Sequence, residues 1–426
     1  MDTTLKKIDD ISYTTDYVAN GSFASLKENV EYKNKPDYAV LVRLKDYKSG
    51  WDGDFVYVSE HSYNFLKKSS LVPGDIIISN VGAYAGTVFK TVDLGRPMTL
   101  GPNSVLLRPK EDNNSYIYYF LSSKIGKSYL KSIIGGSAQP KFNKTDLRNL
   151  SIPLPPLPTQ QKIASILSSY DNLIENNTRR IQILEEMAQR IYKEWFVDFK
   201  YPGHENDQMV DSELGMIPEG WLCNFYDVVD FKEGPGLRNW QYRDEGIPFL
   251  NIRTLIKNDI DLTKVQYLDP QEVEKKYQHF LLEENDHVVS SSGTLGRIAT
   301  IRKDHLPLML NTSIIRMRPK ANNMGIWQLK HFMMSKYFQH QINAFAIGSA
   351  QPNYGPSHLK QMSIIAPTKE ISDKYENKVS SFEKLINLLV KKNNIFTKTR
   401  DYLLPKLISG KIDVSDLDID TSIIND

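Results

Sequence analysis

The sequence predicts an α+β fold: two mixed α/β domains in a pseudo-twofold arrangement, separated by two long helices that form an antiparallel coiled coil. The first observation behind this prediction is the pentapeptide Gly-Ser-Ala-Gln-Pro, which occurs at residues 136–140 and again at 348–352. The second is a similar order of short strands, a glycine turn and a short helix before each copy. The third is a long helical pattern after each copy. A repeat of about half the chain indicates a duplicated globular unit rather than a solenoid.

The bulk composition restricts the class of protein. The chain has 426 residues, of which 40% are hydrophobic and 24% charged, and these values suit two or three globular domains. Its net charge is only +2, so nucleic-acid binding has to come from local basic patches. The single cysteine, Cys223, excludes an internal disulfide and a cysteine-based zinc site. With no apparent signal segment and no long apolar run, we expect a cytoplasmic protein without membrane contact.

The elements of the first half follow from apolar runs. Strands are predicted at residues 38–44, 54–58, 75–79 and 104–109. Gly82 and Gly86 interrupt the pattern, and residues 86–89 resume it, as in a hairpin. Residues 116–125 are apolar at helical spacing and predict a short helix before the first pentapeptide.

The second half repeats this order. Strands are predicted at residues 248–253, 285–290 and 314–319, and a helix at 327–338. Gly293 and Gly296 stand where Gly82 and Gly86 stood. The halves share little outside these anchors, which is typical of one fold that carries two different surfaces.

The long helices have apolar residues at alternating spacings of three and four, over residues 163–195 and 371–407. This spacing predicts a coiled-coil seam. Thr159 and Thr368 are predicted N-caps, and Gly410 ends the second helix. Each helix is about 37 to 40 residues, or ~55 to 60 Å, long. Such apolar stripes most naturally pack against each other.

Two asparagines and one proline stand out in the predicted helices. Asn177 and Asn393 occupy seam positions, where a buried Asn fixes the register, or each faces water at a frayed point. Pro405 is expected to kink the last turn of the second helix.

These patterns divide the chain into segments. They are residues 1–152 (first domain), 153–199 (first long helix), 200–214 (connecting loop), 215–366 (second domain), 367–412 (second long helix) and 413–426 (acidic tail). We expect the tail to be mobile.

No motif predicts catalysis. A Gly-x-Gly-x-x-Gly fingerprint, a phosphate-binding Gly-Lys-Ser/Thr loop and an Asn/Asp-Pro-Pro-Tyr motif are all missing. The eight histidines are scattered, and His331 and His340 are predicted to be surface or core residues rather than metal ligands. We therefore expect neither catalytic nor metal-binding residues on this chain.

Duplicated domains at a fixed separation suit DNA, where half-site spacing follows protein geometry. Cations for phosphates occur together with Asn, Arg and aromatic residues for base edges, after residue 42 and again at 232–243. The alternative is a solvated charged face. DNA contacts are predicted at Arg43, Lys45, Tyr47, Lys48, Asn80, Gln139, Lys141, Arg238, Asn239, Arg253, Ser291, Ser292, Thr294, Arg297, Gln351, Asn353 and Tyr354. For the two pentapeptide glutamines, base reading and capping of the long helix both remain open.

Four further stretches carry a family resemblance. Residues 154–163 read Leu-Pro-Pro-Leu-Pro-Thr-Gln-Gln-Lys-Ile, and residues 184–196 read Leu-Glu-Glu-Met-Ala-Gln-Arg-Ile-Tyr-Lys-Glu-Trp-Phe. Residues 214–221 read Leu-Gly-Met-Ile-Pro-Glu-Gly-Trp, and residues 403–410 read Leu-Leu-Pro-Lys-Leu-Ile-Ser-Gly. With these stretches the chain resembles, over nearly its whole length, the specificity (S) subunit of bacterial type I restriction-modification systems. The second long helix departs from the first because it lacks the Gln-Gln-Lys-Ile opening.

The resemblance implies two target recognition domains, each reading one half of a bipartite site in double-stranded DNA. It implies a coiled coil whose length sets the spacer and on which two methyltransferase (modification) subunits dock with S-adenosylmethionine. Restriction/translocase subunits would add ATP- and Mg-dependent translocation and cleavage. The chain itself would hold no cofactor and would be a non-catalytic subunit.

Two alternatives stand beside this interpretation. One is a coiled-coil adaptor that bridges other proteins without reading DNA, and the other is an enzyme with an unrecognised site. The bases recognised do not follow from the sequence, because direct readout depends on side-chain poses.

Overall fold

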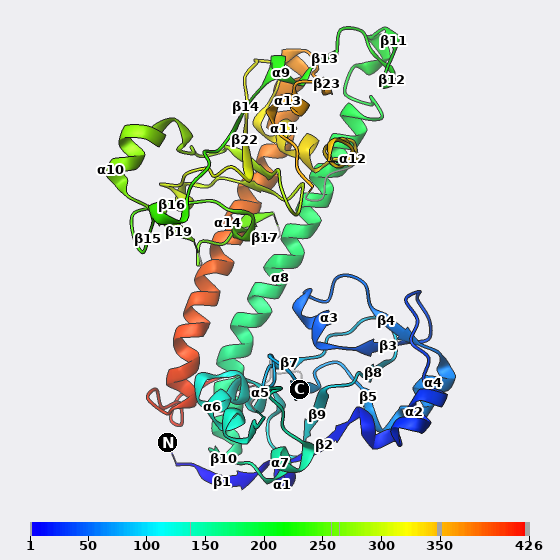
Figure 1. The fold of residues 1–426 in the computed structure, drawn as a ribbon, viewed down its shortest axis with the longest axis vertical. Coiled ribbons are helices and arrows are strands. Elements are labelled where there is room, and N and C mark those ends of the chain that lie inside the picture. Colours follow the sequence, from blue (N-terminus) through cyan, green and yellow to red (C-terminus); the bar gives the residue numbers. More distant parts are fainter. Residues whose placement is uncertain (1, 137, 257, 264, 347–351, 422–426) are drawn as a thin grey trace. The chain divides into compact units, whose positions relative to one another are not determined.

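In a computed structural model, the chain forms two compact units. We call them unit 1 (Met1–Asn176 with Lys392–Asp426) and unit 2 (Asn177–Lys391). The structure describes residues 2–421 except 137, 257, 264 and 347–351. Each unit combines sheets and short helices with segments of both long helices (Figure 1), which confirms the predicted mixed α/β domains.

Unit 1 contains short strands and helices that lead into the first long helix. They are β1 (Thr4–Lys7), α1 (Ile8–Ile11), β2 (Ser12–Asp16), α2 (Phe23–Asn29), β3 (Ala39–Val42), α3 (Leu44–Lys48), β4 (Val56–Val58), α4 (Glu60–Phe65), β5 (Ser70–Leu71), β6 (Ile76–Ser79), β7 (Val88–Lys90), β8 (Met98–Leu100), β9 (Ser104–Pro109), α5 (Asn114–Ser122), α6 (Lys124–Ile133), α7 (Lys144–Asn149), β10 (Ser151–Leu154) and the long helix α8 (Leu157–Phe196).

Unit 2 continues with the following elements. They are β11 (Met209–Ser212), β12 (Gly215–Pro218), β13 (Leu222–Asn224), α9 (Phe225–Val228), β14 (Val229–Glu233), β15 (Tyr242–Arg243), β16 (Ile247–Phe249), β17 (Leu255–Ile256), β18 (Asp259–Ile260), β19 (Gln266–Leu268), α10 (Pro270–Glu272), β20 (His287–Ser290), β21 (Ile298–Thr300), β22 (Ile314–Pro319), α11 (Ile326–Met334), α12 (Lys336–Phe345), α13 (Pro356–Leu359), β23 (Ser363–Ile365) and the long helix α14 (Lys369–Ile408).

Each unit is built on an equivalent four-stranded antiparallel sheet. The strand orders are β2-β9-β6-β7 in unit 1 and β14-β22-β20-β21 in unit 2. Successive side chains of a strand alternate between faces. Ile76 and Ile78 therefore enter one apolar cluster and Ile77 the other, so β6 is buried on both faces. Burial on both faces explains why its sequence is a continuous apolar run.

An ion pair between an arginine and a buried aspartate repeats in the two sheets. Asp75 precedes β6 and accepts two hydrogen bonds from Arg108, at 2.7 and 2.6 Å. Asp286 precedes β20 and accepts two from Arg318, at 2.6 and 2.9 Å. The side chains of both aspartates are no more than 2% exposed. This repeat, which the sequence analysis missed, is further evidence for duplication.

The two long helices pack against each other within each unit. In unit 1 the rings of Tyr170 (α8) and Phe396 (α14) are 6.2 Å apart. In unit 2 the rings of Trp195 (α8) and Tyr375 (α14) are 5.6 Å apart. In unit 1 the later residue of α8, Ile174, accepts a hydrogen bond from the earlier residue of α14, Asn393, at 3.3 Å. The order of partners along α14 is thus the reverse of that along α8, as an antiparallel coiled coil requires.

The seam asparagines follow the buried alternative. Asn177 is only 7% exposed. Asn393 is half-buried, and its Nδ2 donates to the carbonyl of Ile174 at 3.3 Å. Both therefore belong to the helix packing rather than to frayed points.

The helix ends differ partly from the prediction. Thr159 is not the N-cap of α8, because its N–H already bonds the Pro156 carbonyl at 2.9 Å inside the first turn. Thr368 is confirmed as the N-cap of α14, with its Oγ1 3.5 Å from the N–H of Ile371. α14 continues through Pro405, and Gly410 follows its end with a φ of 73°.

Two segments that the sequence predicts as single helices each form two consecutive helices in the structure. The helix predicted at 116–125 ends at Ser122, and Ser123 caps α6 by accepting the N–H of Gly126 at 3.0 Å. Likewise, Ser335 separates α11 from α12 and accepts the N–H of Phe338 at 3.3 Å. In each case a serine that could have continued the helix caps a new one instead.

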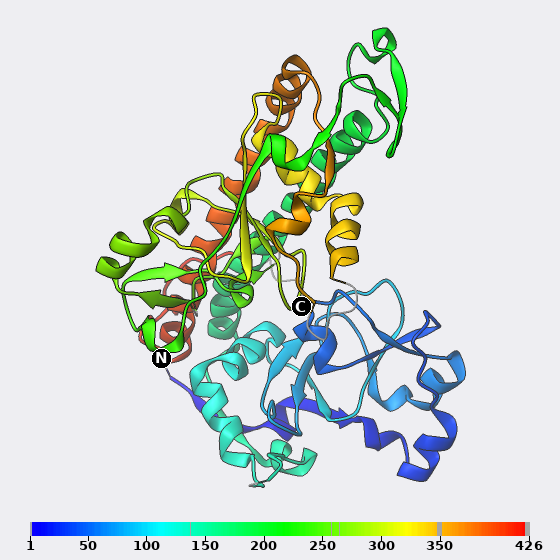
Figure 2. The ribbon, with the colours of Figure 1, turned by 45° about the horizontal axis from the view of Figure 1, so that its top comes forward.

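Three other segments also correct the prediction. Residues 251–253 form a capped turn after β16 instead of the end of a strand. Part of the predicted 200–214 loop pairs as the β11–β12 hairpin, which stands near the C-terminal end of α8 (Figures 1 and 2). The tail is docked where described: Val414 is fully buried, and Lys162 of α8 donates to the Ser415 carbonyl at 2.6 Å.

Candidate nucleic-acid interface

In unit 1, two loops are joined by their backbones. We call residues 80–87 the first glycine loop and residues 135–142 the first repeat loop. The N–H of Gly82 donates to the Pro140 carbonyl at 2.8 Å, and the N–H of Phe142 donates to the Asn80 carbonyl at 3.1 Å. Three predicted DNA-contacting residues, Asn80, Gln139 and Lys141, are thereby brought together, the last two with exposed side chains.

Unit 2 repeats this joint. The second glycine loop is residues 291–297, and residues 352–354 are the described part of the second repeat loop. The N–H of Gly293 donates to the Pro352 carbonyl at 3.1 Å, and the N–H of Tyr354 donates to the Ser291 carbonyl at 3.0 Å. The proline of the pentapeptide thus has the same structural task in both units. Gln351 lies outside the described residues.

The cations near α3 differ in their freedom. Arg43 precedes α3, and its guanidinium bonds the buried Asp46 at 2.7 and 3.2 Å and the Asp54 carbonyl at 3.0 Å. Arg43 is therefore already paired. Lys45 and Lys48 are exposed on α3 and neither pairs with a carboxylate among the described residues, although the Lys48 ammonium lies over the Tyr84 ring. They remain the better candidates for phosphate contacts.

The structure buries two predicted DNA contacts, Tyr354 and Ser291, and packs a third, Tyr47, against the core. Tyr47 belongs to a core cluster, since its ring stacks on Phe89 with centroids 4.8 Å apart. Tyr354 is 1% exposed and Ser291 is fully buried. Burial also raises the pKa of the Tyr354 phenol. The side chains of Tyr354 and Ser291 are not accessible to water, so they do not contact DNA in this conformation. Tyr47 is only half-buried and stays a prediction.

In unit 2, Arg297 links the second glycine loop to the turn after β16. Its Nη1 lies 3.4 Å from the Ile252 carbonyl and 3.3 Å from the Leu255 carbonyl. Arg253 on this turn is exposed, as are Thr294 and Asn353, while Ser292 is half-buried. Predicted residues from three parts of the sequence therefore gather around this loop.

Arg238 and Asn239 lie on a separate, anchored turn. The N–H of Arg238 donates to Oε1 of the buried Gln241 at 2.9 Å. Nε2 of Gln241 donates to Glu272 at 3.0 Å and to the Tyr277 hydroxyl at 3.2 Å. This anchor holds Arg238 and Asn239 exposed beside Trp240, which is 73% exposed.

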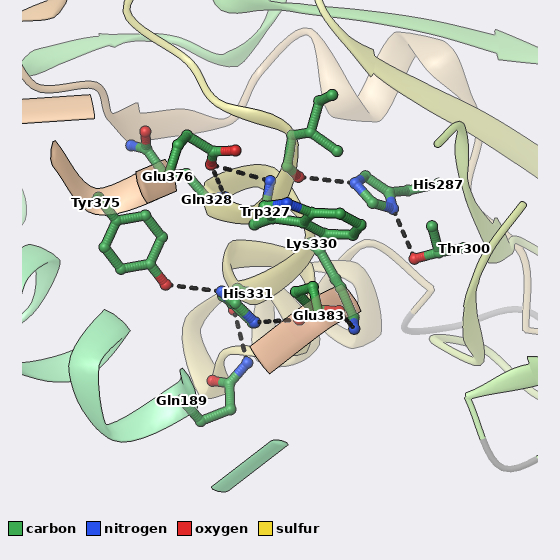
Figure 3. Close-up of polar contacts among 11 residues, drawn as sticks. Gln189, His287, Thr300, Trp327, Gln328, Lys330, His331, Tyr375, Glu376 and Glu383 are labelled. Carbon is green, nitrogen blue, oxygen red and sulfur yellow. Dashed lines mark hydrogen bonds and ion pairs between the residues drawn. The ribbon is translucent and has the colours of Figure 1, made fainter. Parts of the chain in front are cut away.

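A buried polar cluster ties α11 to α14 in unit 2 (Figure 3). The Glu383 carboxylate on α14 accepts from Lys330 at 2.6 Å and from Nε2 of His331 at 3.0 Å. Nδ1 of His331 lies 2.7 Å from the Tyr375 hydroxyl. Burial alone would raise the pKa of Glu383, but Lys330 and His331 lower it to about 2. The cluster is satisfied within the protein, and it fixes α11 on the long helix.

A second carboxylate caps α11. Oε1 of Glu376 accepts the backbone N–H groups of Trp327 at 3.0 Å and Gln328 at 2.9 Å (Figure 3). A negative charge at a helix N-terminus is favourable. Both carboxylates are thus engaged in holding the domain to its helix.

Among the residues that the structure describes, no group of three or more His, Cys, Asp or Glu is placed to hold a metal ion. Within the same part of the chain, no helix has the length and apolar character needed to cross a bilayer.

The fold and the repeated loops define a duplicated two-domain protein whose exposed side chains differ between the copies. The chain belongs to the type I restriction modification DNA specificity domain family, which matches residues 5–186 and 224–395. Its relatives include two specificity subunits of Methanocaldococcus jannaschii. The type I restriction enzyme MjaIX subunit is 28% identical over 97% of this chain and 94% of its own length. The MjaVIII subunit is 28% identical over 80% of each.

A solved structure shares the fold. The S subunit of a type I restriction-modification system from M. genitalium superposes with a TM-score of 0.55 at 17% identity, and the match covers 96% of both chains. This likeness confirms the architecture of two domains and two long helices.

Proposed function

We propose that this chain reads DNA for a type I restriction-modification complex, each unit recognising one half of a bipartite double-stranded site. The observation that carries the proposal is the loop joint. The two units build it from the same backbone hydrogen bonds but surround it with different exposed side chains. A shared backbone arrangement that carries different exposed side chains in the two units suits the recognition of two different half-sites. The family and its named relatives support the same role.

We further propose that the long helices set the spacer and receive two methyltransferase subunits. Large apolar side chains are exposed along them, and such side chains can mark interaction sites. These are Leu173, Ile183, Met187, Leu388, Ile395 and Tyr402. S-adenosylmethionine is assigned to the methyltransferase subunits, and ATP and Mg to restriction/translocase subunits. The complex would act on cytoplasmic DNA, with this chain as its non-catalytic part.

Expression of the chain with the methyltransferase subunit of its own system tests the first proposal. We expect adenine methylation at one bipartite motif, read by sequencing that detects methylated bases, and none without this chain or without its partner. The variant Arg238→Ala should relax one half of the motif only, since one base contact is worth about 1–3 kcal/mol. Methylation by the purified chain alone would show that it is an enzyme.

The adaptor alternative predicts a different result. In that case the double variant Lys141→Ala plus Arg238→Ala would leave the motif and the extent of methylation unchanged, while the complex assembled normally. Size-exclusion chromatography of the assembled complex is the control, because it separates lost DNA reading from lost assembly.

The spacer proposal has its own test. Seven residues inserted into α8 after Asn176 and seven into α14 after Lys391 retain the heptad seam. They lengthen each helix by about 10 Å, so the methylated motif should gain about three base pairs of spacer at ~3.4 Å each. The half-sites themselves should not change. An unchanged spacer in a folded, active complex would contradict the proposal.

A further inference from the structure

Tyr84 is an exposed aromatic side chain at the tip of the first glycine loop. Its side chain is 57% exposed, although an apolar ring of this size usually contributes to a core. The sequence analysis did not select it. Its signal is the segment Gly82-Ala83-Tyr84-Ala85-Gly86, in which a lone aromatic residue stands between alanines and glycines.

The loop that carries Tyr84 is held firmly. The N–H of Gly86 donates to the Ser79 carbonyl at 2.8 Å, and that of Ala85 donates to the Gly82 carbonyl at 3.0 Å. The φ values of Gly82 and Gly86 are 88° and 86°, a region that favours glycine. Together with the bond from Gly82 to the repeat loop, these contacts fix the backbone on both sides of Tyr84.

The surroundings of Tyr84 are basic. The ammonium group of Lys48 lies over its ring in a cation–π contact. Lys141 is exposed on the repeat loop, whose backbone bridges Val81 of the glycine loop. Neither residues 80–87 nor residues 135–142 contain an acidic residue. Lysines contact the phosphates of duplex DNA, and an exposed ring between them can act as a wedge at a base step.

The equivalent loop of unit 2 lacks this feature. Between Gly293 and Gly296 stand Thr294 and Leu295, and Leu295 packs against an apolar cluster. The backbone joint is shared, so the aromatic ring is a difference in surface and not a requirement of the fold.

We propose that Tyr84 is a specificity-determining residue of unit 1, whose ring wedges against a base of the half-site while Lys48 and Lys141 contact the flanking phosphates. The inference rests on the proposed function, since it presupposes that unit 1 reads DNA. In this proposal the first glycine loop contacts a base through the Tyr84 ring. Lys48 on α3 and Lys141 on the first repeat loop bind the phosphates on either side.

The test uses the complex with its methyltransferase subunits and a duplex that carries the motif mapped for the wild type. We expect Tyr84→Ala to weaken binding about 10- to 100-fold, the range of one lost base contact. Tyr84→Phe retains the ring and should bind within about threefold of the wild type. Methylated-base sequencing should show relaxed choice at one position of one half-site for Tyr84→Ala.

Tyr226→Ala is the matched control. Tyr226 is 49% exposed, and the ammonium groups of Lys320 and Lys360 lie 4.3 and 5.2 Å from its ring centroid. It precedes β14, and Lys320 follows β22. The strand register places both at the end of the unit 2 sheet opposite to the glycine loop. We expect wild-type binding and motif for this variant.

Several outcomes would overturn the inference. These are wild-type affinity and motif for Tyr84→Ala, an equal loss in Tyr84→Phe, or lost assembly of Tyr84→Ala with the methyltransferase subunit, which would make Tyr84 a protein contact. Circular dichroism verifies that each variant is folded. Tyr84→Leu keeps an apolar side chain at this position but removes the ring, so a loss of binding in this variant too would support the role of the ring. A wild-type complex without any sequence preference would instead refute the proposed function itself.

Discussion

Replacement of Glu383 by alanine is expected to lower the free energy of unfolding of unit 2 by about 3–5 kcal/mol, the usual cost of removing one partner of a buried ion pair. The side chain of Glu383 is 1% exposed, and it compensates the charge of Lys330, which is itself 9% exposed. Without the carboxylate, Lys330 stays buried without its counter-ion and His331 loses one hydrogen bond. Chemical denaturation of the full chain, with hydrogen exchange to locate the change in unit 2, measures the effect.

The pH dependence of the same variant gives a second measurement. The folded-state pKa of Glu383 is about 2, below its ordinary value of 4.5. A carboxylate with a lowered pKa contributes stability that is present above pH ~4.5 and is lost as the pH falls toward ~2. The difference in stability between wild type and Glu383→Ala should therefore shrink across this range. A constant difference would contradict the assigned charge state.

The control for this experiment lies on the same helix. Glu370 pairs with Lys374 at 2.7 Å, but the side chain of Glu370 is 75% exposed. Exposed pairs of this kind contribute about 0 to 1 kcal/mol. If Glu370→Ala destabilised the protein as much as Glu383→Ala, burial would not be the cause of the large effect.

Gly126→Ala is expected to destabilise unit 1 by at least about 3 kcal/mol, at the upper end of the cost of overpacking. Alanine is normally better than glycine in a helix by about 1 kcal/mol. Here, however, a Cβ would lie 2.0 Å from the Phe120 carbonyl oxygen and 2.6 Å from the Leu121 Cα. Both are backbone atoms, so α5 and α6 would have to separate. Hydrogen exchange should locate the lost protection in these helices.

Lys127→Ala provides the comparison, because this neighbouring residue is exposed on α6. It should change the free energy of unfolding by less than about 0.5 kcal/mol, as surface substitutions usually do. A neutral or stabilising Gly126→Ala would show that the contact between α5 and α6 relaxes easily.

The sequence predicted those parts of the fold that depend on local pattern. The apolar run at residues 104–109 predicted β9, because buried side chains give a strand this pattern. The alternating spacing of three and four predicted the two long helices α8 and α14. The breaks between α5 and α6 and between α11 and α12 depend on tertiary contacts, and the local sequence pattern did not show them. Ser123 and Ser335 each have a favourable place inside or outside a helix, and packing decides between them. The docked tail was missed because its acidic composition hides Val414, whose burial depends on contacts with distant residues.

The candidate interface was predicted in part. Gln139, Lys141 and Asn353 were selected from residue type, and they lie on the joined loops. Tyr354 was selected for the same reason, but it turns inward. Residue type indicates which groups can meet DNA, whereas the direction of a side chain depends on its neighbours in space. The backbone hydrogen bonds between the two loops determine these directions, and they join residues that are far apart in the sequence.

The joint between glycine loop and repeat loop has a consequence for divergence. Its bonds join backbone amides to backbone carbonyls, as with Gly82 and Pro140 or Gly293 and Pro352. Side chains at the tip of the loop are not needed to close it. Substitutions there can accumulate in one copy without unfolding that copy or disturbing the other. The two copies of the duplicated domain can therefore change their exposed side chains independently, while both keep the same backbone joint.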